Sequence, residues 1–180
     1  SAASDVYKRQ ADALAGTINY TGNVTVTDNA YTVAELVAIN AGTTGSITLN
    51  TANVALSGTV ANIKSAFAGT ITTHTGTLEI SDANTTDITA TDITSINTTN
   101  TGTITVANAI DINGSGSEVK AAFDAIDTNT GNATANITGT DYTVAQLKAI
   151  NNKTTGAIVL ATSTSEALSG DATDLADALA

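Results

Sequence analysis

Apolar and polar residues alternate in six short stretches of the chain. Five have the apolar pairs Val24/Val26, Ile47/Leu49, Leu78/Ile80, Ile104/Val106 and Ile158/Leu160, and a weaker one has Ala133, Ala135 and Ile137. Alternation with a period of two predicts a strand with one buried face. Gly22 precedes the first stretch, and Thr-Gly pairs at 44–45, 75–76, 101–102, 130–131 and 155–156 precede the others. We expect these glycines to let the chain leave a short helix through a positive φ.

A second pattern predicts six helix N-termini. A Ser, Thr or Asp is followed three residues later by a polar or acidic residue, and then at once by an aliphatic one. The pairs are Thr32/Glu35, Thr59/Asn62, Thr89/Asp92, Ser115/Glu118, Thr143/Gln146 and Asp171/Asp174, followed by Leu36, Ile63, Ile93, Val119, Leu147 and Leu175. The first side chain of such a pair accepts from free backbone N–H groups, and Glu or Gln returns the bond. Three pairs have the full capping-box pattern: Thr32/Glu35, Ser115/Glu118 and Thr143/Gln146.

Together the two patterns indicate a tandem repeat. The helix starts are 27, 30, 26, 28 and 28 residues apart, and the following glycines lie 13, 17, 13, 16 and 13 residues downstream. Short and long coils therefore alternate, so the repeat is a pair of coils of about 55 residues that begins near residue 11. A unit of this size buries its apolar face only by stacking on its neighbours.

The predicted fold class is α/β: a right-handed solenoid of about six coils. Each coil has a short helix and a short strand, and the strands of successive coils pair in parallel into a sheet on one side. A second brief strand is expected near Val54/Leu56, Ile88, Ile110/Ile112 and Leu168. The alternating strand residues would form one side of the core and Leu36, Ile63, Ile93, Val119, Leu147 and Leu175 the other. A mixed globular α/β domain is the alternative.

The two ends of the chain differ from its middle. Residues 5–10 translate back as GAT GTG TAT AAG AGA CAG, which resembles a sequencing adapter. We therefore interpret residues 1–10 as an assembly artefact or a disordered tail and exclude them from the fold. Residues 11–180 are expected to be a solenoid fragment from a metagenomic sequence, without a capping coil at either end.

Composition restricts the possible partners. The chain has 17 acidic and 6 basic residues, a net charge of −11 and no Cys. A nucleic-acid or anionic-membrane surface needs a basic footprint, so these partners are not expected. No apolar run approaches the length of about 20 residues that spans a membrane. With 36 Thr among 180 residues, the chain is instead typical of an acidic, threonine-rich extracellular protein.

Few residues suggest a catalytic or metal-binding role. His74 is the only histidine, and without a second His or any Cys it is expected to be a solvated loop residue rather than a zinc ligand. Asp82, Asp87 and Asp92 are spread along one connection. The loop Asp111-Ile-Asn-Gly-Ser-Gly-Ser-Glu118 makes Asp111, Asn113 and Glu118 weak candidates for calcium ligands, with helix capping as the alternative. We expect no catalytic residues and no cofactor.

The outward strand positions include a partial array of threonines. Thr25, Thr48, Thr105 and Thr134 are the candidate surface-binding residues, and Glu79 and Val159 interrupt them. A regular Thr array on a flat parallel sheet orders water, so ice or a carbohydrate surface is a possible ligand. The alternative is that Thr stands there for its β propensity.

Several segments resemble a known group of repeats. They are Tyr31-Thr-Val-Ala-Glu-Leu36, Thr43-Thr-Gly-Ser-Ile-Thr-Leu49 and Asp171-Ala-Thr-Asp-Leu-Ala-Asp-Ala-Leu179. They are similar to the Thr/Ala/Asp-rich tandem repeats of very large secreted or cell-surface proteins of cyanobacteria and other aquatic bacteria. The resemblance implies an extracellular, adhesin-like or structural role, with an unknown surface, a glycan or self-association along the repeat axis as the partner. Two other functions remain open: an ice- or carbohydrate-surface binder, and the repeat region of a secreted enzyme whose catalytic domain lies elsewhere.

Overall fold

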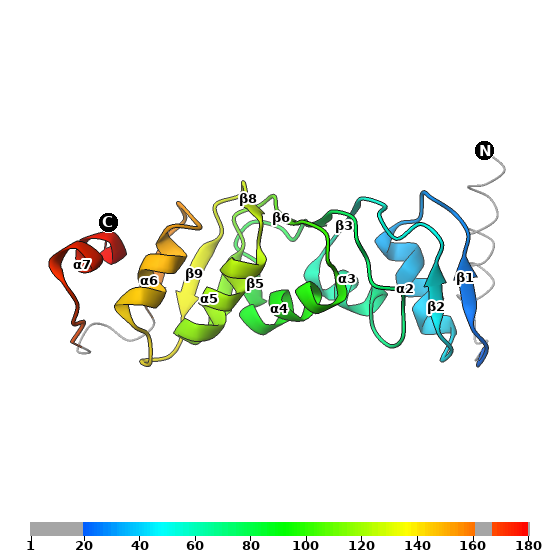
Figure 1. Cartoon of the computed structure of the whole chain (residues 1–180), viewed down its shortest axis with the longest axis horizontal. Coiled ribbons are helices and arrows are strands. Elements are labelled where there is room, and N and C mark those ends of the chain that lie inside the picture. Colours follow the sequence, from blue (N-terminus) through cyan, green and yellow to red (C-terminus); the bar gives the residue numbers. More distant parts are fainter. Residues whose placement is uncertain (1–19, 161–166, 180) are drawn as a thin grey trace. The chain divides into compact units, whose positions relative to one another are not determined.

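The computed structural model describes residues 20–160 and 167–179 (Figure 1). Residues 20–80 and 96–103 form one compact unit, and residues 81–95, 104–160 and 167–179 form a second. Helix α4 (Ala90–Thr99) begins in the second unit and ends in the first. Both units are mixed α/β with short parallel strands, which confirms the fold class at this level. The predicted tail at residues 1–10 lies outside the described residues.

The first unit has two pairs of parallel strands and two helices packed against each other. Its elements are β1 (Val24–Val26), α2 (Val33–Gly42), β2 (Ile47–Leu49), β3 (Leu56–Gly58), α3 (Val60–Ala66) and β4 (Leu78–Ile80). Strand β1 pairs with β2, and β3 pairs with β4. Helix α2 packs on α3.

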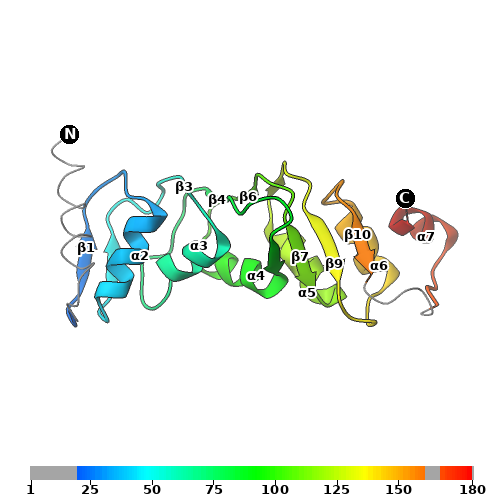
Figure 2. The same ribbon diagram turned by 180° about the vertical axis from the view of Figure 1, so that it is seen from behind.

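The second unit contains a four-stranded parallel sheet in the order β5-β7-β9-β10. Its elements are β5 (Asp87–Thr89), β6 (Ile104–Val106), β7 (Asp111–Gly114), α5 (Gly116–Ala125), β8 (Thr128–Asn129), β9 (Thr134–Ile137), α6 (Val144–Asn151), β10 (Ile158–Leu160) and α7 (Ala172–Leu179). Figure 2 shows β7, β9 and β10 side by side. Strand β6 pairs with β8, and α6 packs between α5 and α7.

All six predicted helix starts are confirmed, each helix beginning one residue after its predicted first cap residue. Thr32, Ser115 and Thr143 form complete capping boxes with Glu35, Glu118 and Gln146. The side chains of Thr59 and Asp171 accept a single bond from the backbone three residues on. Local polar residues therefore determine where each helix begins, because a cap accepts hydrogen bonds from backbone N–H groups that the helix itself leaves free.

Most of the core is built from the predicted aliphatic residues, with Tyr31, Phe67 and Phe123 also buried. Leu36, Ile63, Ile93, Val119 and Leu147 are buried on the helices, whereas Leu175 is only partly buried and Ala178 is the buried residue of α7. The predicted second strands are present as β3, β5 and β7, but Leu168 is not in a strand. Inward aliphatic side chains on strands and helices thus supply the apolar burial that stabilises each unit.

The strand partners differ in part from the prediction. Strands β1 and β2 pair as expected, and so do β9 and β10. Strand β4 does not lie beside β2 but beside β3, and the other neighbour of β2 is Ile71. Strand β9 pairs with β7 rather than β6. More than one strand between successive helices carries the alternating pattern, so the pattern alone does not decide which of them pairs with a strand farther along the chain.

The expected role of the Thr-Gly glycines is wrong. Among the described glycines only Gly69, after α3, has a positive φ, 74°. The glycines before the strands are needed for close approach instead. A Cβ on Gly45 would overlap the carbonyl of Gly22, and one on Gly156 would overlap the carbonyl of Asn132. Stacked turns pass so closely that only a hydrogen side chain fits between them.

Candidate functional surfaces

The outward threonines do not form one continuous array. Thr25 and Thr48 are register partners on β1 and β2, and both are exposed. They form a pair of neighbouring hydroxyl and methyl groups on parallel strands.

In the second unit the threonines have other neighbours than predicted. Thr105 of β6 pairs with Thr128, not with Thr134, and Thr134 lies beside Asp111. Val159 lies beside Asn136 and is 46% exposed. The β5-β7-β9-β10 sheet therefore mixes Thr with Asp, Asn and Val, and Thr105 and Thr128 lie on other strands.

Glu79 also has a specific partner. The hydroxyl of Ser57 on β3 donates a 2.9 Å hydrogen bond to its carboxylate. The two residues are register partners, so this position of the first unit holds a Ser–Glu pair rather than a Thr pair.

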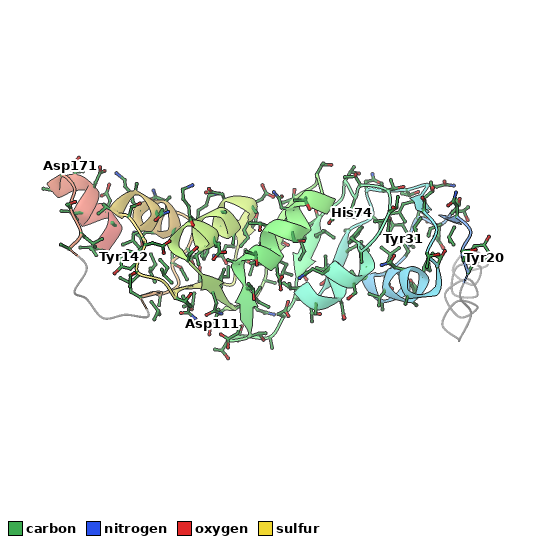
Figure 3. The ribbon with its side chains drawn as sticks, turned by 90° about the horizontal axis from the view of Figure 1, so that it is seen from below. Tyr20, Tyr31, His74, Asp111, Tyr142 and Asp171 are labelled. Atoms are coloured by element: carbon green, nitrogen blue, oxygen red, sulfur yellow. The ribbon has the colours of Figure 1, made fainter. Side chains whose placement is uncertain are left out.

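Of the three calcium candidates, two lie on a strand and Glu118 lies in the first turn of helix α5. Asp111 and Asn113 lie on one strand, β7 (Figure 3, Asp111 labelled). The amide nitrogen of Asn113 donates to the Asp87 carboxylate at 3.0 Å and to the Asp111 carbonyl at 2.9 Å. The described residues contain no group of three or more His, Cys, Asp or Glu side chains that could hold a metal ion.

Glu118 acts as a helix cap. Its carboxylate accepts from both the backbone N–H and the hydroxyl of Ser115, each at 2.9 Å. These bonds stabilise the charged form, so the pKa of Glu118 is lowered, chiefly by the bond from the Ser115 backbone. The capping alternative for this loop is confirmed.

The other carboxylates are dispersed. Asp82 is buried, Asp87 pairs with Asp111 across β5 and β7, and Asp92 lies in the first turn of α4. Asp87 and Asp111 place like charges side by side on parallel strands, and the amide of Asn113 lies against one of them.

The prediction for His74 is wrong. Its side chain is fully buried in the first unit, with 0% exposure (Figure 3). Nδ1 lies 3.0 Å from Oδ1 of Asn100, and Nε2 lies 2.8 Å from the carbonyl oxygen of Val54. The ring also contacts Phe67, with 5.5 Å between centroids. A Thr-rich segment suggested solvent exposure, but the segment's neighbours in the fold bury the ring.

His74 belongs to a recurring set of buried polar residues that sequence reasoning missed. Thr43, His74, Asn100 and Thr154 are buried, and each stands two residues before a glycine that precedes a strand. Thr43 Oγ1 donates to the Gly22 carbonyl at 2.8 Å and accepts from the Gly45 N–H at 3.0 Å. Thr154 Oγ1 does the same with Ala133 and Gly156, at 2.6 and 2.9 Å. We call these four residues the buried polar joints; their fixed offset from the glycine is the signal that could have found them.

A hollow of about 260 Å³ lies between α6, β10 and α7. Its lining is mostly aliphatic, with Leu147, Ile158, Leu160 and Leu179, and contains no titratable side chain. It offers no acid, base or nucleophile for a reaction.

No helix in the described part of the chain is long and apolar enough to cross a membrane. Comparisons with protein-family models, with curated proteins and with solved structures found no match.

Proposed function

We propose that this chain is a non-catalytic structural or adhesive repeat segment of a large extracellular bacterial protein. In this proposal the coils stack into a right-handed solenoid of about six coils, and any recognition is spread over a repeated face. The acidic, threonine-rich composition supports the extracellular location.

The main observation behind the proposal is that the same buried Thr hydrogen-bond pattern occurs in both units. In each, a buried Thr hydroxyl donates to a carbonyl 21 residues earlier and accepts from the glycine two residues later. Thr43 makes this joint in the first unit and Thr154 in the second. Equivalent contacts at equivalent places are what a stack of similar coils produces.

A second repeated contact lies on the helical side. Asn40, near the end of α2, donates from its amide to the carbonyl of Ser65 in α3 at 2.7 Å. Asn151, at the end of α6, donates in the same way to Asp177 in α7 at 3.0 Å. Helices that follow each other along the chain are thus connected by the same residue type at the same place, which supports a mechanical role distributed over the coils.

Native-state hydrogen exchange tests the proposal on the full chain. In a stack with nearest-neighbour coupling, damage to one coil stays local. We expect Thr43→Val to lower the protection of amides in β1 and β2 while β9 and β10 keep theirs, and Thr154→Val to do the reverse. A uniform loss of protection across the chain in both variants would show a single cooperative globular domain instead.

Ice or carbohydrate binding is the second candidate, and the adjacent exposed Thr25 and Thr48 favour it. Replacement of Thr48 by Tyr would disturb the regular spacing of these groups at about 4.8 Å. If the face binds ice, the purified chain shows thermal hysteresis that Thr48→Tyr abolishes; sedimentation with insoluble polysaccharides tests the carbohydrate case. Absence of both activities in the folded wild-type chain would contradict this second candidate.

A further inference from the structure

We propose that the outer edge of β10 binds the β1 edge of a second copy of this chain, so that copies join head to tail. The inference rests on the proposed structural role and names a partner for it. The two surfaces that meet are the edge of β1 that faces away from β2 and the hollow of about 260 Å³ beside β10.

Strand β10 is less covered than the strand beside it. Ile137 on β9 has 0% exposure, whereas its register partner Leu160 is only partly buried. Ile158 is also only partly buried, although Ala135 beside it has 0% exposure. Ile158 and Leu160 line the hollow together with Leu179 of α7, which is 65% exposed. Their burial by another strand would stabilise an association.

The backbone of β10 is also arranged for one more strand. In a parallel sheet, each residue directs its N–H and carbonyl to one neighbouring strand, and successive residues alternate between the two neighbours. The Ala157 carbonyl accepts from Ala135 on β9 at 2.9 Å, so the backbone groups of Ile158 point to the opposite edge. Ile47, the first residue of β2 as Ile158 is of β10, uses its own outward N–H to bond the Thr70 carbonyl at 2.8 Å. Among the described residues, no strand pairs with the outer edge of β10.

Strand β1 presents a matching edge. The N–H of Val24 and the carbonyl of Val26 bond to residues at the two ends of β2, at 2.9 and 3.0 Å. By the same alternation, the N–H and carbonyl of Thr25 point away from β2. In the described part of the chain, β2 is the one strand that pairs with β1. The backbone of Thr25 can therefore bond a parallel strand of another molecule.

Two glycines indicate the register of this contact. A Cβ on Gly156 would overlap the backbone of an earlier turn, whereas the atoms nearest to a Cβ on Gly22 belong to the exposed Tyr20 side chain. Gly22 stands two residues before β1, as Gly156 does before β10. If the Tyr20 side chain turns aside, the turn at Gly22 can stack on the turn at Gly156 of another copy. This stacking places Val24 beside Ile158.

The two surfaces are uncharged, although the chain has a net charge of −11. The hollow has no titratable side chain in its lining, and β1 consists of Val24, Thr25 and Val26. Copies of an acidic chain repel one another, and neutral edges bring the least charge together. The contact joins two different edges, so each pair of copies keeps one free edge of each kind and the assembly stays open.

Sedimentation of the full chain at rising concentration and physiological ionic strength tests the association. We expect the mean mass to rise beyond that of a dimer. Leu179→Lys places a charge in the hollow and should raise the dissociation constant at least about tenfold. Val159→Lys is the matched control, because Val159 is 46% exposed on the same strand edge but does not line the hollow. A monomeric wild type, or equal losses in the two variants, would overturn the inference.

A mixing experiment tests the head-to-tail order. Thr25→Pro removes the outward N–H of β1 at an exposed position and leaves the bonds to β2 in place. At concentrations where the wild type associates, Thr25→Pro and Leu179→Lys should each stay monomeric, and their mixture should form dimers and nothing larger. Association of Thr25→Pro by itself, or a mixture that stays monomeric, would contradict the head-to-tail contact.

Two controls keep these results separate from other failures. Circular dichroism shows whether each variant folds, and if Thr25→Pro does not fold, the comparison of Leu179→Lys with Val159→Lys decides. Hydrogen exchange of the wild type, Thr43→Val and Thr154→Val tests the proposed function independently. A monomeric wild type whose variants lose protection only locally would refute the head-to-tail contact and leave the structural role supported.

Discussion

The hydroxyl of Tyr31 donates a 2.6 Å hydrogen bond to the backbone carbonyl of Thr51, 20 residues further along the chain. The ring of Tyr31 is buried, at 2% exposure. Burial disfavours the phenolate, so the pKa of Tyr31 is raised to about 12. The bond connects the start of α2 to the segment before β3 and ties the stability of the first unit to the protonation of one phenol.

This bond predicts a specific alkaline instability. Because the folded pKa of Tyr31 lies above the value of about 10 for an unfolded chain, its contribution is complete below pH 10 and is lost as the pH rises toward 12. Absorbance at 295 nm and circular dichroism, followed together, should show ionisation of one tyrosine coincident with unfolding. Tyr31→Phe should lower stability at pH 7 by about 1 kcal/mol and weaken this alkaline transition. An unchanged alkaline transition in the variant would contradict the assignment.

Because two turns approach closely at Gly45, the addition of one methyl group there should strongly destabilise the fold. Gly45→Ala places Cβ onto the Gly22 carbonyl, a backbone atom that moves only with its turn. We expect Gly45→Ala to lower the free energy of unfolding, measured with urea, by about 3 kcal/mol or more, which is the upper range for a single substitution. Gly170→Ala is the control, because the atoms nearest its Cβ lie at an ordinary contact distance of 3.6 Å. Gly170→Ala should change the free energy of unfolding by no more than about 0.5 kcal/mol. Equal losses at Gly45 and Gly170 would contradict the close approach of the turns at Gly45.

The amide bonds between helices predict a matched pair of variants. Asn40→Ala and Asn151→Ala each remove the donor to a carbonyl of the next helix. Each substitution should lower the free energy of unfolding, measured by chemical denaturation, by about 1 kcal/mol. Asn50→Ala, at an exposed position after β2, is the control and should be close to neutral. A neutral result at both Asn40 and Asn151 would show that these bonds do not stabilise the fold.

The ion pairs between α6 and α7 predict a salt-dependent effect. Nζ of Lys148 lies 2.6 Å from Asp174 and 3.0 Å from Asp177. Hydrogen bonds to the two carboxylates raise the pKa of Lys148, and the bond from Lys148 lowers the pKa of Asp174. Lys148→Met should lower the melting midpoint slightly in low salt, and the difference should vanish in 1 M NaCl because exposed pairs are screened.

The same pairs predict a dependence on acid. Since the folded pKa of Asp174 is depressed, its stabilisation is present at neutral pH and is lost as the pH falls below about 4, the range of an unfolded carboxylate.

For the salt experiment, Lys120→Met is the control, because its partner Asp124 lies on the same helix. A salt response of Lys120→Met equal to that of Lys148→Met would show that the contact between helices has no special role.

The sequence by itself determined the local structure. Each helix begins one residue after a predicted cap, because Thr32, Ser115 and Thr143 satisfy backbone donors of their own first turn. The strands at Ile47–Leu49 and Leu78–Ile80 follow from alternation, since a period of two places aliphatic side chains on one face. These features depend on residues within a few positions of one another.

Only the tertiary structure decided which segments meet. Strand β4 pairs with β3, and Thr105 pairs with Thr128, because several segments between successive helices satisfy the alternating pattern equally well. His74 and Thr43 are buried because turns some 20 residues apart in sequence stack closely enough to exclude water and to satisfy their polar atoms. Close approach of distant backbone, which also explains Gly45, depends on the packing of segments far apart in sequence; the recurring glycines mark where it occurs but do not tell which segments meet.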